Sequence, residues 1–214
     1  MWTLSRIAQF AGAVVIGLGV ATPAFALVTT ETDRPTWETA VGGTIVNDPF
    51  ATPITQGMSI MFDSGVVSTV TVCCSFADEN VVRNPPGGPS EVLYQNRLGP
   101  DGTGDQNWTF PMLVNGFGAD WGGVQNVVVT ILGESFEIDS VVGASDGFLG
   151  FVSDTPFMSV DFTHTSTNPS ARDIYTADNL AFSKAAVVPE PATVTLFAIG
   201  LLGVGLTLRR RTAR

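Results

Sequence analysis

An adjacent carboxylate and amide in the second half of the chain could bind a metal ion. Asp178 and Asn179 directly precede the apolar segment 180–182, and oxygens of these two types are ligands that Ca²⁺ takes in proteins. Asp48, in an N-terminal segment expected to be a strand, is a candidate third ligand. The alternative is an Asx turn, in which this pair only starts the last strand. The sequence contains no Asp-x-Asp-x-Asp-Gly loop that would strengthen a calcium prediction. Ca²⁺ is therefore considered only as a structural ion, and no other cofactor is expected.

Paired carboxyl groups would be the chemistry of a secreted hydrolase, since a glycosidase needs two of them facing one sugar. The candidate carboxylates are those of Asp33, Glu38, Asp48, Glu134, Glu137 and Asp139. Glu137 and Asp139 share a face if their segment is a strand, but so do polar residues on any solvent-facing sheet surface. The one histidine, His164, is expected in a polar loop with no cysteine or second histidine beside it. The sequence contains neither a Gly-x-Ser-x-Gly nor a His-Glu-x-x-His motif. We therefore do not predict an enzyme.

Exposed aromatic rings would be the chemistry of sugar binding, because flat rings stack on the faces of pyranoses. Trp121 is the candidate, since it lies in the sequence Asp-Trp-Gly-Gly at 120–123, which predicts a loop between strands where a ring is accessible. The alternative is that Trp121 packs in the core, as large aromatic side chains commonly do.

The N-terminal end predicts export. Arg6 supplies a positive charge, residues 10–20 form an apolar run, and Ala24 and Ala26 flank Phe25 as a small-x-small cleavage site. This order is typical of a secretory signal peptide. We therefore expect residues 1–26 to be removed and the mature chain to begin at Leu27.

The C-terminal end carries three blocks in a fixed order. They are Pro189, Glu190 and Pro191, then the uncharged apolar run 192–208, then Arg209, Arg210 and Arg211. A helix over the apolar run would span roughly 25 Å, which is short but sufficient for a thin bilayer core of about 30 Å. The prolines stop such a helix from extending back into the preceding segment. The arginines are expected to stay in the cytoplasm and to leave the rest of the chain outside.

These blocks closely resemble the PEP-CTERM sorting signal of Gram-negative bacteria, and residues 188–193, Val-Pro-Glu-Pro-Ala-Thr, match its most characteristic part. The resemblance implies that an exosortase, a membrane-embedded cysteine transpeptidase, recognises segment 188–214 through Glu190 and its flanking prolines. It implies an inner-membrane intermediate anchored by 192–208 with the basic tail 209–214, and then delivery to the cell surface or extracellular matrix. A plain C-terminal anchor is the alternative, although it would not need Pro-Glu-Pro.

The segment between the two ends, 27–187, is strongly acidic. It holds five of the ten basic residues and nineteen of the twenty acidic ones, a formal charge of −14. This charge argues against nucleic acid or an anionic membrane surface as a partner. The segment is long enough for one domain with a sizeable core.

The only two cysteines, Cys73 and Cys74, are adjacent. Neighbouring side chains of a regular strand point to opposite faces, so an ordinary disulfide between them would need a distorted peptide. The favoured interpretation is one buried and one half-exposed free thiol at a strand end. A vicinal disulfide and an intermolecular bridge are the alternatives, and neither a disulfide framework nor a cysteine-based zinc site can be built from this pair.

Hydrophobic periodicity in 27–187 is two almost throughout, in short Val, Ile, Phe and Thr runs broken by Gly, Pro, Asn and Asp. The expected strands are 59–62, 66–72, 92–94, 108–110, 113–117, 124–132, 135–142, 148–152, 158–163 and 180–182. Tight turns are expected at 63–65 and 133–134, and no helix is predicted outside the terminal segments.

The strand spacing predicts an all-β domain, a jelly-roll-like β-sandwich over 27–187. Residues 80–105 interrupt the pattern with two Pro- and Gly-rich stretches. We expect this part to be an exposed, mobile excursion that carries only a short strand.

Segments 115–120, 147–157 and 177–182 contain a Gly-aromatic strand, a following turn and an Asp-Asn pair that opens the last strand. Together they are similar to a β-sandwich ectodomain common among PEP-CTERM proteins, which implies a fold like that of carbohydrate-binding jelly rolls. Gly116, Gly118, Gly147 and Gly150 are expected to allow close backbone approach or positive φ, while phenylalanines fill the space between two sheets.

Three functions from different classes follow from these observations. The first is an exported, non-catalytic cell-surface or matrix protein, structural or adhesive in an exopolysaccharide-rich envelope, with an exosortase as its processing partner. The second is a calcium-stabilised carbohydrate-binding module that uses Trp121 to hold extracellular polysaccharide. The third is a secreted hydrolase with paired carboxylates.

Overall fold

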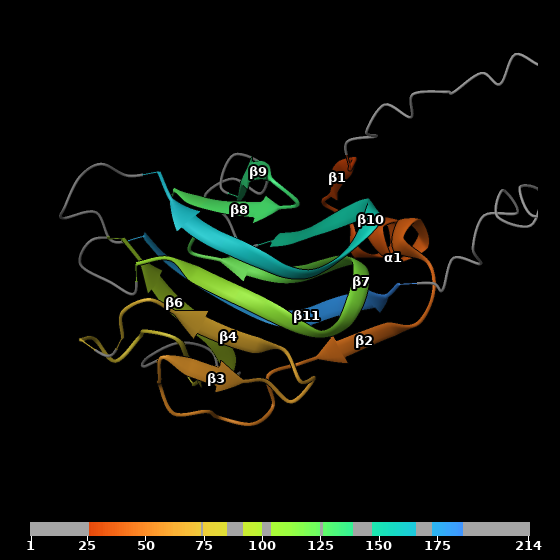
Figure 1. Ribbon diagram of the computed structural model, residues 1–214. Coiled ribbons are helices and arrows are strands. Elements are labelled where there is room, and N and C mark those ends of the chain that lie inside the picture. Colours follow the sequence, from red (N-terminus) through yellow and green to blue (C-terminus); the bar gives the residue numbers. More distant parts are fainter. Residues whose placement is uncertain are drawn as a thin grey trace, which may run out of the picture.

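The computed structural model describes these parts of the chain: 26–73, 75–84, 92–99, 104–124, 126–138, 147–165 and 173–185. Ala24, Cys74, the apolar run 192–208 and the predicted sorting segment lie outside them. No helix within the described ranges is both long enough and apolar enough to cross a membrane. These residues form mainly β-strands with one short helix (Figure 1), which confirms the predicted all-β class.

Two strands are much longer than the others, and each joins two of the strands expected from the sequence. β7 runs through Pro111, and β10 runs through Pro156. In chain order the elements are β1 (Val28–Glu31), α1 (Arg34–Val41), β2 (Ile45–Asp48), β3 (Ser59–Met61), β4 (Val67–Val70), β5 (Val81–Arg83), β6 (Leu93–Leu98), β7 (Gln106–Gly122), β8 (Val127–Ile131), β9 (Glu134–Glu137), β10 (Gly147–His164) and β11 (Asp173–Lys184).

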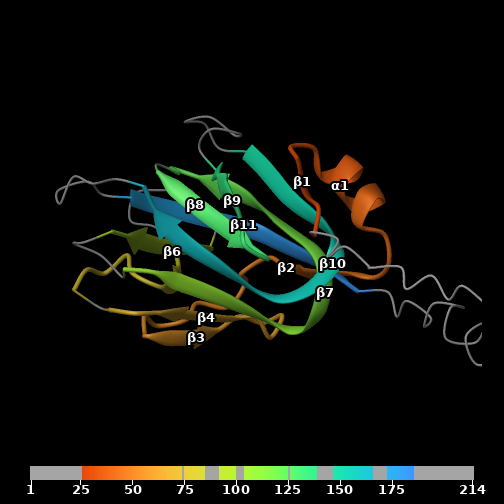
Figure 2. The same ribbon diagram turned by 45° about the horizontal axis from the view of Figure 1, so that its top comes forward.

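The strands belong to one 11-stranded sheet with the central order β5-β6-β11-β7-β10-β8-β9. β7 and β10 pair antiparallel along most of their lengths, with register shifts around Phe157. The N-terminal half of β7 also pairs with β4, whereas its C-terminal half pairs with β11. Both long strands curve strongly (Figures 1 and 2), so the sheet folds back around one core. The expected sandwich of separate sheets is thus a single continuous sheet, because the two long strands belong to both of its halves.

Aromatic side chains fill the space inside the folded sheet. Trp108 lies at their centre, with its ring centroid 4.7 Å from that of Phe162, 5.5 Å from those of Phe62 and Tyr94, and 5.9 Å from that of Trp121. All five side chains are almost completely buried. Aromatic pairs at these distances add about 0.5–1.5 kcal/mol each beyond the burial of their area, so this cluster fixes how the two halves of the sheet face each other.

A buried polar network ties five separate segments together inside the same core. It consists of Ser68, Asn80, Tyr94, Asn96, Gln106 and Tyr175. The Gln106 amide nitrogen donates to the Ser68 hydroxyl at 2.7 Å, and its oxygen accepts from Asn96 at 2.9 Å and from the Tyr175 hydroxyl. Buried polar groups are tolerated when they are hydrogen-bonded, and a network of this kind favours one arrangement of the strands that supply it.

The described residues of segment 80–105, which are 80–84, 92–99 and 104–105, differ from the exposed excursion that was expected, while most of its two Pro- and Gly-rich stretches lies outside the described residues. Its described residues include β5 and β6, and every residue of β6 after Leu93 is buried. β6 pairs with β11 through residues 94–98. The polar residues of β6 made it resemble a loop, but they have partners within the fold. Asn96 belongs to the network, Gln95 accepts from Arg83 at 2.9 Å, and Arg97 donates to Asp78 at 2.8 Å.

Helix α1 was not predicted, and it covers the outer side of β7 and β10. Asp33 caps its first turn, because its Oδ2 accepts hydrogen bonds from the backbone N–H and the hydroxyl of Thr36, and these bonds lower the pKa of the Asp33 carboxyl. Trp37 is fully buried, and its indole N–H donates to the carbonyl of Phe151 at 3.1 Å. The helix is too short to show the period of 3.6 clearly, so its cap was its only strong signal in the sequence.

One of the two predicted tight turns is confirmed, and the other lies at a slightly different position. β3 and β4 form the expected hairpin, with Gly65 at φ 85°. In the hairpin of β8 and β9 the turn lies at Leu132 and Gly133, one residue earlier than expected, and both have positive φ, as a type I′ turn requires.

The favoured prediction of free thiols is wrong for Cys73, which is disulfide-bonded. The chain contains one other cysteine, Cys74, and it lies outside the described residues. The strand geometry that argued against a disulfide does not apply, because Cys73 follows the end of β4.

Replacing Gly150 with alanine should destabilise the protein by about 1–3 kcal/mol. A Cβ atom at Gly150 would lie 2.4 Å from Cδ1 of the buried Trp37 ring, so helix and sheet would have to separate. Urea denaturation of the full chain in mild detergent, followed by tryptophan fluorescence, measures the change. Gly57→Ala is the control, since a Cβ atom there meets nothing closer than 3.6 Å. Equal stability of both variants would contradict the close contact.

The two tyrosines should resist ionisation until the protein unfolds in alkali. Burial raises the pKa of the Tyr94 and Tyr175 hydroxyls above their ordinary value, while in the unfolded chain both titrate near about pH 10. Below that pH the two states hold the same protons; above it the unfolded state loses them first, so the free energy of unfolding falls as pH rises. Tyrosinate absorbance reports only on these residues, because the chain has no other tyrosine. Ionisation near pH 10 with circular dichroism unchanged would refute this.

Candidate functional site

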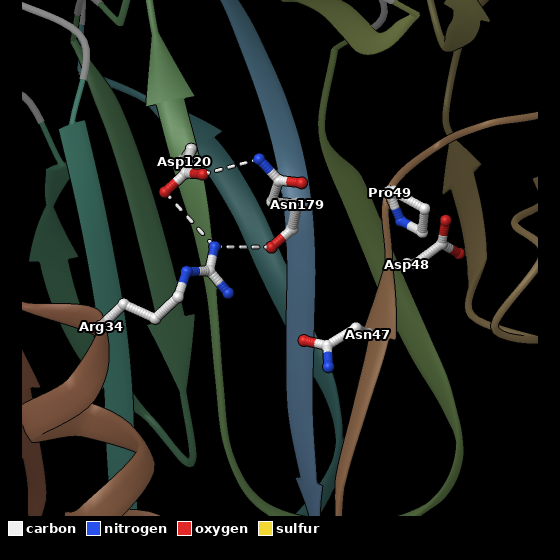
Figure 3. A pocket seen from close by; sticks show the side chains of 6 residues that line it. All are labelled: Arg34, Asn47, Asp48, Pro49, Asp120 and Asn179. Atoms are coloured by element: carbon white, nitrogen blue, oxygen red, sulfur yellow. Dashed lines mark hydrogen bonds and ion pairs between the residues drawn. The ribbon is translucent and has the colours of Figure 1, made fainter.

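A shallow pocket opens on the outer side of the sheet, at the N-terminal end of α1. It has a volume of about 370 Å³ and is lined by Arg34, Asn47, Asp48, Pro49, Asp120 and Asn179 (Figure 3). A second pocket of about 320 Å³ shares Pro49 and Asn179 with the first and adds Ala51, Val92 and Asp178. The two pockets are therefore neighbouring parts of one surface formed by α1, β2, β7 and β11.

Arg34 and Asp120 form the polar centre of the first pocket. One terminal nitrogen of the Arg34 guanidinium donates to Asp120 Oδ1 at 3.3 Å and to the carbonyl of Asn179 at 2.7 Å. The guanidinium carbon also lies 4.6 Å from the centroid of the Phe148 ring. The other Asp120 oxygen accepts from the side-chain amide of Asn179 at 2.9 Å. Both carboxylate oxygens are thus held in place, and the charges of Arg34 and Asp120 offset each other.

Asn179 holds an unusual backbone conformation within a strand. Its φ is 48°, in the left-handed region, and the pairing of β11 with β7 shifts register between Asp178 and Ala181. Asn tolerates this conformation better than most residues. The Asp178 carboxylate accepts from the backbone N–H of Asn179 at 2.7 Å. The irregularity turns the side chain of Asn179 toward Asp120 (Figure 3), and strained backbone of this kind is often found at functional sites.

Asp48, one of the three residues proposed as calcium ligands, directs its carboxylate to backbone N–H groups and not to Asn179 (Figure 3). Asp48 is 1% exposed, and its two oxygens accept from the backbone N–H groups of Phe50 at 2.9 Å and Ser64 at 2.8 Å. Its carboxylate points away from Asn179 (Figure 3). Within the described ranges no group of three or more His, Cys, Asp and Glu side chains is placed to hold a metal ion. Asp48 therefore acts as an acceptor that ties β2 to the hairpin turn at 63–65.

Trp121 lies within β7 and not in the expected loop. Its side chain is 1% exposed, so the alternative that it packs in the core is confirmed. Its indole N–H donates to the carbonyl of Leu149 at 3.0 Å, and its ring stacks on that of Trp108. The glycines at 122 and 123 indicated a loop, but Trp121 pairs with Gly147 on one side and Ala177 on the other. A sugar ring cannot reach this side chain.

The residues considered for catalysis are dispersed among the described parts of the chain. Glu137 ends β9, while Asp139 lies outside the described residues. His164 is the last residue of β10 and not part of a loop, because the strand extends further than its apolar pattern. Asp33 caps α1 and Asp48 is buried. Among the described acids, Asp33 lies at the start of α1, Asp48 at the end of β2 and Glu137 at the end of β9.

The sequence indicated Asn179 but not Arg34, Asn47 or Asp120. The sequence Asp33-Arg34-Pro35 is typical of a helix start, with Asp as the cap and Pro in the first turn. This pattern could have placed Arg34 in a first helical turn. No local pattern connects Arg34 with Asp120, which are 86 positions apart.

Asp48→Asn should lower the free energy of unfolding by about 1–3 kcal/mol, because an amide nitrogen cannot accept from a backbone N–H and leaves one of them unsatisfied. The loss should be the same in calcium and in a calcium chelator. Chemical denaturation of the full chain in both buffers measures it, with Asp63→Asn at the exposed hairpin turn as the control. If calcium stabilised the wild type but not Asp48→Asn, Asp48 would be a calcium ligand after all.

Comparison with models of known families matches residues 187–211 to the PEP-CTERM protein-sorting motif. The match confirms the resemblance that was predicted from Pro189, Glu190, Pro191 and the blocks after them. No curated protein and no solved structure matches the chain significantly. The motif implies an exported protein that an exosortase sorts through a membrane-anchored intermediate. The chain therefore carries a PEP-CTERM protein-sorting motif at residues 187–211.

Proposed function

We propose that this protein is a non-catalytic component of the cell surface or extracellular matrix, with a structural or adhesive role in an exopolysaccharide-rich envelope. The observation that carries the proposal is the sorting motif at 187–211. A sorting motif specifies delivery and not the task of the delivered domain. The task therefore depends on the folded part of the chain.

Two properties of the folded part support a binding role. Its polar pocket is shallow and open, so a segment of a long polymer can lie across it without being threaded into a cavity (Figure 3). The formal charge of −14 on 27–187 favours solubility and weakens attraction to anionic surfaces. Both properties suit a protein that works in a hydrated matrix.

In this proposal the two ends of the chain act in sequence. Residues 1–26 direct export and are removed, and segment 192–208 anchors an inner-membrane intermediate whose basic tail, 209–214, stays in the cytoplasm. The exosortase then recognises Glu190 with Pro189 and Pro191 and releases the folded part to the surface. Extracellular polysaccharide is the proposed partner after release.

A carbohydrate-binding module is the second candidate, and the pocket beside Arg34 is the observation that favours it. The version that uses Trp121 is excluded by the burial of that ring. A hydrolase with paired carboxylates is not supported by the arrangement of Asp33, Asp48 and Glu137, which lie on different elements and have separate surroundings.

Loss of Glu190 should block processing and abolish the surface role. A strain without the gene is complemented with the wild-type chain or with Glu190→Ala, and cell aggregation, fractionation and intact mass are measured. The wild type should restore aggregation and end before Arg209. Glu190→Ala should stay in the membrane with Arg214 still present and should not restore aggregation, because the exosortase no longer recognises the tail.

Glu134→Ala, at the start of β9, is the matched control and should behave as the wild type. A wild-type surface form that still ends at Arg214 would favour a plain membrane anchor. Normal aggregation of the strain without the gene would contradict the adhesive role. Cleavage of the host polysaccharide by the purified protein would contradict its non-catalytic character.

A further inference from the structure

We propose that the pocket formed by Arg34, Asn47, Asp120 and Asn179 binds a neutral saccharide through pairs of ring hydroxyls, without calcium and without aromatic stacking at Trp121. This inference deepens the proposed adhesive function and rests on it, since it names the chemistry by which the folded part would hold polysaccharide. Four properties of the pocket carry it: its charge, its hydrogen-bonding groups, its rigidity and its shape.

The charges in the pocket favour an uncharged ligand. Arg34 is paired with Asp120 at 3.3 Å, so its positive charge is largely offset, and Asp178 lies in the adjoining pocket. An anion would meet these carboxylates and the acidic surface of the domain. A metal cation would meet the guanidinium at the centre and would lack a set of acidic ligands among the described residues. A ligand without net charge is repelled neither by the carboxylates nor by the guanidinium.

The hydrogen-bonding groups suit hydroxyls. One terminal nitrogen of Arg34 holds Asp120 and Asn179, and the remaining guanidinium N–H groups are donors on the same planar fork. Asn47 is exposed and contributes an amide with both a donor and an acceptor. It faces the pocket from the opposite side of β11 to Arg34 (Figure 3). A hydroxyl both donates and accepts, so neighbouring hydroxyls of a sugar ring match this mixed set better than a carboxylate, which only accepts.

The pocket is largely formed before any ligand arrives. Both oxygens of Asp120 are fixed by Arg34 and Asn179, and the Arg34 guanidinium rests on the Phe148 ring. α1, which carries Arg34, is held to the sheet by the fully buried Trp37. Fixed side chains lose little conformational entropy on binding. The conformation of Asn179, at φ 48°, serves this arrangement, because it directs the amide of Asn179 to Asp120.

The shape fits a short stretch of a chain of sugars. A volume of about 370 Å³ lies at the lower end of the range of small-ligand pockets, about 300–1,000 Å³. The second pocket continues past Pro49 to Ala51 and Val92, whose apolar surfaces can meet the C–H face of an adjoining sugar. One ring is held by the polar centre, and the polymer extends over the apolar part.

Titration of the full chain with simple sugars tests the inference. The chain is kept in a zwitterionic detergent without sugar groups, and binding is followed by saturation-transfer NMR. The probes are the methyl glycosides of glucose, galactose and mannose, with galacturonate as an anion and glucosamine as a cation. We expect at least one neutral glycoside to bind more tightly than either charged sugar, equally in calcium and in a chelator.

Asn47→Ala should weaken binding of that glycoside about fivefold, the loss expected for one hydrogen bond. Gln56→Ala removes a similar amide outside both pockets and should bind as the wild type does. Asp120→Asn removes the charge that offsets Arg34, so galacturonate should gain affinity relative to the neutral glycoside. This reversal distinguishes a ligand seated beside Arg34 from weak binding elsewhere on the surface.

Three results would overturn the inference: no neutral glycoside binds, a charged sugar binds the wild type at least as tightly, or Asn47→Ala binds as the wild type does. Failure here is distinguishable from failure of the adhesive function. If no sugar binds but the strain without the gene has lost aggregation, the pocket assignment is wrong and the surface role stands.

Discussion

The antiparallel pairing of β7 with β10 is the constraint on which the rest of the structure depends. These two strands continue through both halves of the folded sheet, so their register determines which side chains meet in the core. The register shifts around Phe157 lie where both strands curve, as expected of irregularities that increase strand bending. β4 and β11 pair directly with β7, and β1 and β8 pair directly with β10.

The same two strands build different surfaces on their two sides. Their inner side carries large aromatic residues such as Trp108 and Phe162, while their outer side carries Gly116 and Gly150 where the helix approaches. A Cβ atom at either glycine would lie within 2.6 Å of α1 side chains. The small residues let α1 lie close to the sheet, and this brings Arg34 to Asp120. The pocket is thus a consequence of how the helix packs.

Delivery and the proposed binding are assigned to separate parts of the chain. The sorting motif acts as a short linear sequence and does not depend on how 27–187 folds. The pocket, in contrast, exists only when four elements are assembled. A linear motif is therefore recognisable in the sequence, whereas a pocket formed by several elements exists only in the folded chain.

The sequence by itself determined the all-β class, the hairpin around Gly65 and the sorting motif, because period-two patterning, turn residues and linear motifs are local properties. It divided β7 and β10 at their prolines, missed α1, and placed Trp121 in a loop, since strand pairing overrides local preference. It identified Asp178 and Asn179 as notable but could not assign their partners. Arg34 and Asn179 lie 86 and 59 positions from Asp120, so only the tertiary structure, by packing α1 and β11 against β7, decided that these residues form one site.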